Sequence, residues 1–173
     1  MEKTKQSNSF ENFLRRTGAS MLYLGYFPFA SGTLGSAVTV LGIWFLNQKY
    51  PHFFTAANIV YYWGAMIAVV AVSIFISSKS KDVFGCDDPS QVIIDELAGQ
   101  FITFFLIPIS IQTLIAGFVL FRFFDIVKPF PVYKMEEMDD GVGITMDDVA
   151  AGVYANVSLL LVIAGYHWVK GYL

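Results

Sequence analysis

Apolar residues fall into five runs that are separated by short polar stretches, at positions 33–46, 55–76, 92–108, 111–127 and 147–169. A helix needs about 20 apolar residues to cross the hydrocarbon core of a bilayer, so the second and last runs predict crossings outright. The third and fourth runs are shorter and carry charges at their ends. The first is the weakest, although an apolar stretch at 19–30 could lengthen it. The pattern predicts an all-α, polytopic membrane helical bundle with five crossings, four being the alternative.

The composition supports a membrane protein rather than a soluble domain. Of 173 residues, 55% are hydrophobic and 14% are charged, against about 25% charged residues in soluble domains. The mean hydropathy is +0.57, which excludes intrinsic disorder. The net charge of −3 argues against a nucleic-acid binder, because no basic stripe is available to neutralise phosphates. The single cysteine, Cys86, cannot form an internal disulfide, nor a thiolate zinc site by itself.

The charged residues gather on one side of the predicted bundle. Five crossings place residues 1–32, 77–91 and 128–146 on the same side, together with nine of the eleven Lys and Arg. The positive-inside rule makes this side cytoplasmic. All fourteen Asp and Glu also lie there or at that end of a membrane helix. Topology does not require this acidic bias, so it indicates a site at the cytoplasmic face.

The first residues are polar and mixed in charge. No apolar core precedes a small-residue cleavage site, so we do not expect a cleaved signal peptide. We predict a polar cytoplasmic N-terminal arm at 1–18 and a single membrane-embedded catalytic domain at 19–173. Within the arm, Arg15 and Arg16 are expected to meet anionic lipid head groups.

Two carboxylates, Asp95 and Glu96, lie inside the third apolar run. A charge at that depth is costly unless it is paired or bound to a cation, so such residues are functional candidates. The structural alternative is that Asp95 pairs with Arg122 or Lys128. Upstream, Pro89 suits the first turn of the helix that carries these carboxylates.

Arg122, Asp125 and Lys128 are spaced three apart, which places them on one face of a helix that Pro129 ends. One interpretation is a structural ladder of ion pairs in which Lys128 extends to water. Because other segments bring carboxylates to the same side, we favour a site. Asp125 would then bind a cation, while Arg122 and Lys128 bind phosphate.

Two further motifs contain glycines. Residues 141–143 predict a flexible turn before the last helix, with Asp147 as its cap or first-turn residue. The next carboxylate, Asp148, enters the apolar run and is favoured as functional. Small and hydroxyl residues at 30–36 could cradle a phosphate at a helix N-terminus; equally, they could allow close helix packing.

The combined set predicts metal-assisted phosphoryl chemistry. Carboxylates from three segments with two basic residues and no soft ligand describe a site for a hard divalent cation, which we predict to be Mg²⁺. Both histidines, His52 and His167, lie on the opposite side, which argues against a histidine-based mechanism. A small membrane cation carrier or channel that uses the same carboxylates is the alternative. Five further acidic residues are predicted to be solvated loop charges: Asp82, Glu136, Glu137, Asp139 and Asp140.

Taken together, the four motifs between about residues 28 and 155 resemble the phosphatidylglycerophosphatase A family in content and order. The resemblance implies a Mg²⁺-dependent phosphatase of the bacterial cytoplasmic membrane that converts phosphatidylglycerophosphate to phosphatidylglycerol. It also implies residue roles. Metal binding or water activation would fall to Asp95, Glu96, Asp125, Asp147 and Asp148, with Asp88 as a second-tier ligand. Phosphate binding would fall to Arg122 and Lys128, assisted by Thr33 and the Gly32 backbone.

Overall fold

The computed structural model describes residues 2–86 and 89–171, with side chains from residue 9 onward, and every regular element in these ranges is helical. This confirms the predicted all-α class. Two short 3-10 helices, Leu24–Tyr26 and Ala56–Asn58, accompany eight α-helices. The α-helices are α1 (Glu2–Ala19), α2 (Ser31–Lys49), α3 (Ile59–Ser77), α4 (Ser80–Phe84), α5 (Ile94–Thr103), α6 (Ile111–Val127), α7 (Val132–Glu136) and α8 (Asp140–Gly171).

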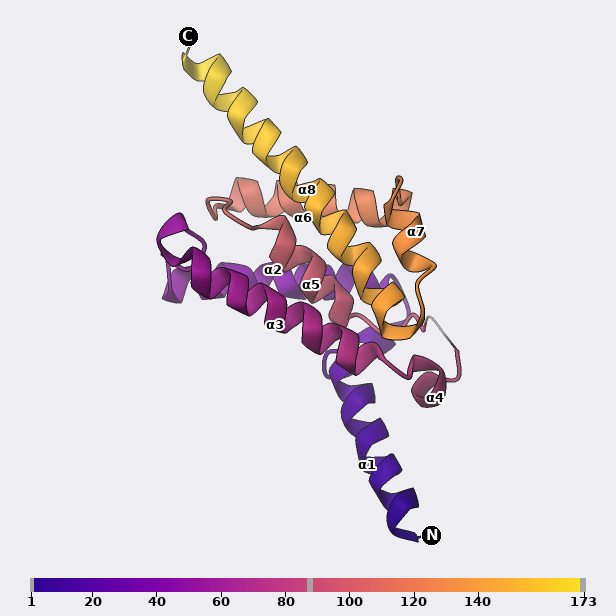
Figure 1. Ribbon diagram of the computed structural model, residues 1–173. Coiled ribbons are helices and arrows are strands. Elements are labelled where there is room, and N and C mark those ends of the chain that lie inside the picture. The colour runs from indigo at the N-terminus through magenta and orange to yellow at the C-terminus, as the bar shows by residue number, and fades with distance from the viewer. Residues whose placement is uncertain (1, 87–88, 172–173) are drawn as a thin grey trace.

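The short helix α5 lies at the centre of the bundle and packs against α8, α2, α3 and α6 (Figure 1). Its contact with α8 depends on glycine. A Cβ atom on Gly152 would lie only 2.4 Å from the carbonyl oxygen of Gly99, so a larger residue would force the helices apart. This close approach is typical of membrane helices, whose backbones meet at small residues. It holds the acidic start of α5 beside α8.

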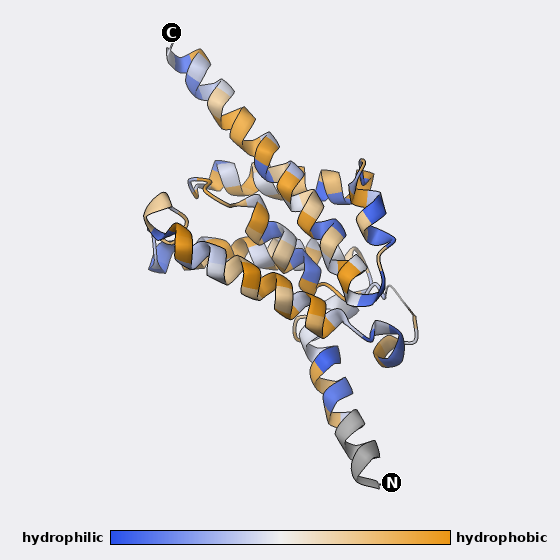
Figure 2. Cartoon of the chain, in the orientation of Figure 1, coloured by the Kyte–Doolittle hydropathy of each residue, from blue (hydrophilic) through white to orange (hydrophobic). Residues whose placement is uncertain are grey.

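Two helical segments are long and apolar enough to cross a membrane, Ala56–Ser77 and Asp140–Gly171. Large apolar side chains cover the exposed face of the first, where Val60 is 76% exposed and Phe75 is 66% exposed. Figure 2 shows the same hydrophobic character along α3 and on the outer part of α8. An apolar surface of this extent suits lipid contact. The length and apolar surface of these two segments therefore suit a helical membrane protein.

The predicted crossing at 92–108 differs from the observed structure. Helix α5 has ten residues and is about 15 Å long, half the thickness of the hydrocarbon core. The chain continues without regular structure to α6, and Phe104 and Ile107 are fully buried there. Asn156 of α8 donates from its amide to the carbonyl oxygens of Thr103 (3.0 Å) and Phe105 (2.8 Å). Irregular backbone is tolerated at membrane depth when the protein itself satisfies it in this way.

The apolar stretch at 19–30 does not lengthen the first membrane helix. The backbone has positive φ at Met21, Leu22, Tyr23 and Ala30, which is incompatible with a continuous α-helix. Helix α2 therefore begins only at Ser31.

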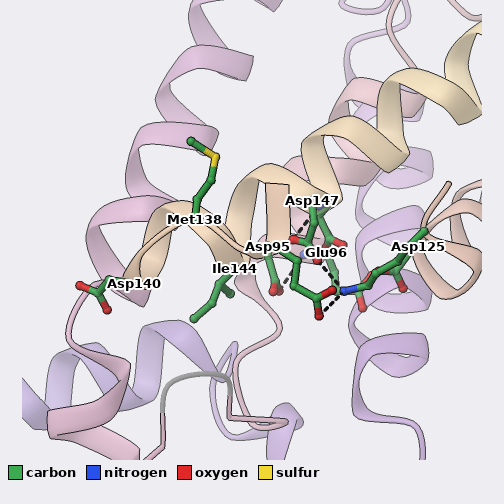
Figure 3. Close-up of a pocket in the computed structure, with 10 residues that line it drawn as sticks. Asp95, Glu96, Asp125, Met138, Asp140, Ile144 and Asp147 are labelled. Carbon is green, nitrogen blue, oxygen red and sulfur yellow. Dashed lines mark hydrogen bonds and ion pairs between the residues drawn. The ribbon is translucent and has the colours of Figure 1, made fainter. Parts of the chain in front are cut away.

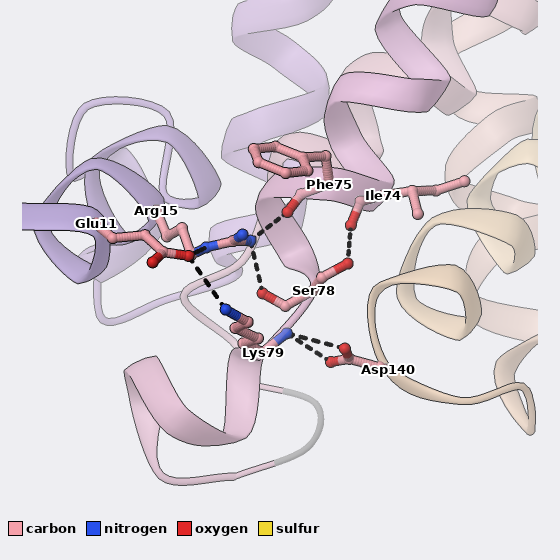
Figure 4. Close-up of polar contacts among 7 residues, drawn as sticks. All are labelled: Glu11, Arg15, Ile74, Phe75, Ser78, Lys79 and Asp140. Carbon is pink, nitrogen blue, oxygen red and sulfur yellow. Dashed lines mark hydrogen bonds and ion pairs between the residues drawn. The ribbon is translucent and has the colours of Figure 1, made fainter. Parts of the chain in front are cut away.

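Arg15 joins α1 to the end of α3 (Figure 4). The prediction that it meets lipid head groups is therefore wrong. Its side chain is 7% exposed and donates to the carbonyl oxygens of Phe75 and, at 3.0 Å, of Ser78. Glu11 accepts a 2.9 Å bond from Arg15 Nε and also pairs with Lys79. Hydrogen bonds from Arg15 and Lys79 lower the pKa of Glu11. Because the last carbonyl groups of a helix lack internal partners, the guanidinium group caps α3.

The neighbouring Arg16 is also engaged within the protein, since its Nη2 donates to the carbonyl oxygen of Val83 at 2.6 Å. On the other side of the junction, the Asp140 carboxylate at the start of α8 accepts from the backbone N–H of Lys79 at 2.8 and 2.9 Å. These contacts draw α1, α4 and the start of α8 to one end of α3. The same end holds the starts of α2 and α5 and the end of α6.

Candidate active site

Three carboxylates from three different helices converge at this end of the bundle (Figure 3). Glu96 of α5, Asp125 of α6 and Asp148 of α8 each offer an oxygen, and these atoms all lie within 4.8 Å of one another. Asp95 and Asp147 stand beside them on the wall of the same pocket, whose volume is about 210 Å³. The structure therefore brings together the five carboxylates that the sequence singled out.

The helix starts differ from those predicted. Pro89 lies in the loop before α5, which begins at Ile94. Asp95 and Glu96 are therefore first-turn residues, where the helix dipole favours negative charge. Helix α8 instead begins at Asp140, so Asp147 and Asp148 lie two turns inside it and Asp147 is not a cap.

The predicted flexible turn at 141–143 is helical because its first glycine packs on the end of α3. A Cβ atom on Gly141 would lie 2.5 Å from the carbonyl oxygen of Ile74 and 2.5 Å from the backbone nitrogen of Ser78. The glycine is needed here for close packing rather than for a turn. Helix α8 can therefore extend back across the site.

Arg122 links α6 to α5 through the carboxylates. Its Nη1 lies 2.5 Å from Glu96 Oε1 and 2.9 Å from Asp125 Oδ2. Charge-assisted contacts of this kind are the strong class of protein hydrogen bond. Within the described residues, no basic side chain pairs with Asp95. The ion pair that the sequence suggested between Asp95 and Arg122 is formed between Glu96 and Arg122 instead.

The start of α2 closes one side of this pair. Gly32 leaves no room for a side chain, since a Cβ atom there would lie 2.3 Å from Glu96 Oε1 and 3.2 Å from Arg122 Nη1. One turn later, the buried hydroxyl group of Ser36 donates to Glu96 Oε2 at 2.5 Å. The first turns of α2 thus hold the Glu96 carboxylate in place.

Lys128 binds carboxylates that the sequence did not pair with it. Its Nζ lies 2.8 Å from Asp147 Oδ2 and 2.7 Å from Glu136 Oε1. The expected pair with Asp125 is not among the ion pairs of the described residues, because Lys128 caps α6 in the left-handed conformation (φ 45°) and leaves the helical face. Burial opposes the charge of Lys128, but the two hydrogen-bonded carboxylates outweigh burial and raise its pKa. Lys128 therefore stays protonated at neutral pH.

Three contributors were missed. Ser36 belongs to the small-residue motif, and its position four residues after Gly32 was a usable signal. Glu136 was expected to be a solvated loop charge, yet it pairs with Lys128 and lines the pocket. Asp140 was given the same interpretation, although it too lines the pocket and binds the backbone of Lys79. Nothing local in the sequence distinguishes Glu136 or Asp140 from Glu137, because tertiary packing alone brings them to the site.

Other predicted residues are less engaged. Thr33 lies on the first turn of α2 beside Gly32, and its hydroxyl has no hydrogen-bond partner within the described ranges. Asp88 lies outside the described residues. Neither histidine lines the carboxylate pocket: His52 lies in the loop that follows α2, and His167 lies near the C-terminal end of α8. Their placement on the opposite side of the membrane stays a prediction.

The charges of the site do not balance. Seven carboxylates line the pocket, and the basic side chains that pair with them within the described residues are Arg122 and Lys128. Acidic groups therefore outnumber basic groups by five. Asp148 is 4% exposed, and its Oδ2 is buried without a hydrogen-bond partner. A buried carboxylate is costly unless it is paired or coordinates a metal. The arrangement therefore suits a ligand that brings positive charge to this point.

Comparison with known proteins identifies the family. The sequence profile of the family described as Phosphatidylglycerophosphatase A matches residues 17–163. The chain belongs to the phosphatidylglycerophosphatase A family. It is 36% identical over 142 residues to phosphatidylglycerophosphatase A of Haemophilus influenzae (80% of each chain). It is 29% identical over 151 residues to the Escherichia coli protein of that name (86% of this chain, 82% of the relative).

A Bacteroides thetaiotaomicron protein is 37% identical over 153 residues, which cover 85% of this chain and 89% of the relative. It is provisionally named a phosphatidylinositol-3-phosphatase. No solved structure matches the chain. The resemblance seen in the motifs is thus confirmed, and the site described above belongs to a phosphatase that acts on a lipid phosphate.

Proposed function

We propose that the protein removes the terminal phosphate of phosphatidylglycerophosphate, with Mg²⁺, to give phosphatidylglycerol and inorganic phosphate in phospholipid biosynthesis. The observation that carries the proposal is the cluster of Glu96, Asp125 and Asp148, flanked by Arg122 and Lys128, in a chain of this family. The family assignment disfavours the alternative of a cation carrier. A carrier would also have no need of the basic side chains of Arg122 and Lys128.

The donor set fits Mg²⁺. This ion prefers oxygen ligands and binds through a few carboxylates while keeping waters and substrate phosphate oxygens. Glu96, Asp125 and Asp148 would hold it, because their oxygens are mutually close and one oxygen of Asp148 has no other partner. When bound, the ion supplies a Lewis acid for the phosphoryl group and lowers the pKa of a coordinated water.

The residues of the chain would share the remaining work of hydrolysis. Arg122 and Lys128 bind the phosphate oxygens, and the Nε of Arg122, buried without a partner, is an available donor. A water molecule attacks phosphorus, forming one P–O bond as the P–O bond to the lipid glycerol breaks. A pocket carboxylate takes one proton from the attacking water and gives it to the leaving glycerol oxygen, so that the lipid leaves as an alcohol and the carboxylate returns to its starting state. The Gly32 backbone lies beside the pair of Glu96 and Arg122, and Thr33 follows it on the first turn of α2, so both would assist phosphate binding from that helix.

We further propose that the site faces the cytoplasm, with four full-length crossings and one broken one. Helices α2 and α6, with 19 and 17 residues, are about 28 and 25 Å long and can cross beside α3 and α8. Helix α5 with its irregular continuation forms the fifth passage. This threading keeps all the carboxylates on the side that the positive-inside rule assigns to the cytoplasm.

The Bacteroides relative supports a second candidate substrate, a phosphatidylinositol carrying a phosphate monoester. The experiment is phosphate release by purified protein from detergent-dispersed phosphatidylglycerophosphate and from phosphatidylinositol 3-phosphate, with Mg²⁺ or with excess EDTA. We expect Mg²⁺-dependent release from the first lipid, with phosphatidylglycerol as product. Preferential release from the inositol lipid would replace the proposed substrate. Equal release of phosphate with EDTA and with Mg²⁺ would refute the proposed dependence on a metal ion.

A further inference from the structure

An apolar groove runs between α2 and α6 on the outer surface of the bundle. Its walls are Ala37, Val40, Leu41 and Trp44 of α2, and Ile111, Leu114, Ile115 and Phe118 of α6, around a volume of about 510 Å³. Leu41 is 56% exposed and Ile115 is 61% exposed, so the middle of the groove is open to the surroundings of the bundle. The volume lies within the range of small-molecule sites.

The groove and the active site share a single face of α6. Ile111, Ile115 and Phe118 line the groove, and Arg122 and Asp125 follow them at steps of four and three residues. Positions with this spacing stand above one another on a helix. One end of this face therefore carries the Arg122 guanidinium group at the catalytic cluster, while the residues at the other end are all apolar.

Helix α2 repeats the arrangement on the opposite wall. Thr33 and Gly32 lie at the site end, and Ala37, Leu41 and Trp44 continue from Thr33 at steps of four, four and three residues. The groove is about 10 Å long from Ala37 to Trp44, and one helical turn of about 6 Å separates Phe118 from Arg122. On both walls, the apolar groove residues are therefore followed, one helical turn further on, by residues at the catalytic end of the same helix.

We propose that this groove binds one acyl chain of the lipid whose phosphate is held at Arg122. This inference rests on the proposed function, since it names the part of that substrate which occupies the groove. The stretch of α6 from Phe118 to the cluster at Asp125 is about 10 Å long. It gives a place to the head-group glycerol, the phosphodiester and the acylated glycerol, which lie between the terminal phosphate and the hydrocarbon. A free phosphate or a polar partner would make no favourable contact with the apolar end. An amphipathic lipid can contact both the apolar end and the charged end.

The groove would act through packing and orientation. Lipid tails in the bilayer are as apolar as the groove, so no hydrophobic transfer energy drives the chain into it. What the groove contributes is orientation, because a lipid held there presents its phosphate to Arg122 in a fixed direction. We therefore expect a moderate effect on KM when the groove is filled, rather than loss of catalysis.

The test fills the groove at its site end. Ala37→Phe adds a ring between the helices, and Ala68→Phe on the exposed face of α3 is the matched control. KM is measured for phosphatidylglycerophosphate with two long acyl chains and for its deacylated head group. We expect Ala37→Phe to raise the ratio of the two KM values roughly five- to tenfold, the low end of what overfilling a packed site costs. Ala68→Phe should leave the ratio at the wild-type value.

An unchanged ratio in Ala37→Phe would overturn the proposal. A second readout does not depend on turnover: labelling by phosphatidylglycerol with a photoreactive group on one acyl chain, mapped by mass spectrometry. We expect label on the peptides of α2 and α6, reduced in Ala37→Phe. Equal labelling of α3 and α8 would mean ordinary bilayer contact, and cross-linking between chains would mean a second copy; either result rejects the groove. Absence of wild-type hydrolysis with specific labelling would instead reject only the proposed function.

Discussion

Asp148→Asn should make the metal-free protein more stable while it destroys activity. The buried Oδ2 of Asp148 has no partner, and its carboxylate faces those of Glu96 and Asp125. Removing its charge lowers the excess of acidic over basic groups in the pocket by one. Residues of an active site are often held in such unfavourable surroundings because the ligand relieves them.

The magnitude follows from the spacing. Like charges within 4.8 Å of one another repel by at least about 3.5 kcal/mol at an effective dielectric constant of about 20, and Asp148 has two such neighbours. Arg122, which pairs with both of them, offsets a large part of this repulsion. A net gain of about 2 kcal/mol in the free energy of unfolding remains, which corresponds to a rise in Tm of about 4–8 °C for a chain of this length.

The assay is thermal unfolding in detergent at pH 8, with EDTA and then with Mg²⁺. We expect Asp148→Asn to have the higher Tm in EDTA, and wild type to gain more from Mg²⁺ than the variant. Asp82→Asn makes the same charge change at an exposed position of α4 and should alter neither value. A lower Tm for Asp148→Asn in EDTA, or an equal response to Mg²⁺, would refute the reasoning.

Three further predictions concern the surroundings of the cluster. Gly32→Ala should lower kcat/KM at least about tenfold, because its Cβ would lie 2.3 Å from Glu96 Oε1, whereas Gly42→Ala, with open space around it, should not. Wild-type KM should stay flat from about pH 7 to pH 10, because the raised pKa of Lys128 preserves its charge and its stabilising ion pairs until the pH rises through that value. Lys128→Gln should raise KM throughout this interval. Arg15→Ala should lower the free energy of unfolding by about 1–3 kcal/mol, through unpartnered carbonyl groups at the end of α3, without changing KM.

Each of these predictions has a contradicting result. Wild-type kinetics in Gly32→Ala would mean that α2 does not position Glu96. A rise in wild-type KM between pH 7 and pH 10 that Lys128→Gln abolishes would mean that Lys128 loses its proton in that interval. A change in KM but not in Tm for Arg15→Ala would place this residue in substrate binding rather than in the docking of α1.

Much of the fold follows from the apolar runs, because membrane helices are governed by length and composition. All five runs contain helices, and the ends that the sequence assigned to one side do lie together. The length of α5 could not be predicted, since it ends where Asn156, more than fifty residues later, satisfies the irregular backbone. The early start of α8 likewise depends on Gly141 fitting against α3.

The carboxylates of the site were predictable because burial of charge is costly wherever it occurs. Their partners were less so. Spacing gave the contact between Arg122 and Asp125, but the left-handed cap at Lys128 redirected that side chain to Asp147 and Glu136. The hydrogen bond from Ser36 to Glu96 spans sixty residues, and no local pattern predicts such a pair.

The most direct test of the central claim compares phosphate release from phosphatidylglycerophosphate by wild type and by Asp148→Asn at saturating Mg²⁺, with both proteins shown to be folded. We expect wild type to release phosphate and phosphatidylglycerol, and the variant to be slower by a factor on the order of a hundred or more, the scale on which one precisely placed group contributes. Equal turnover by the two proteins would show that the carboxylate cluster is not the catalytic site.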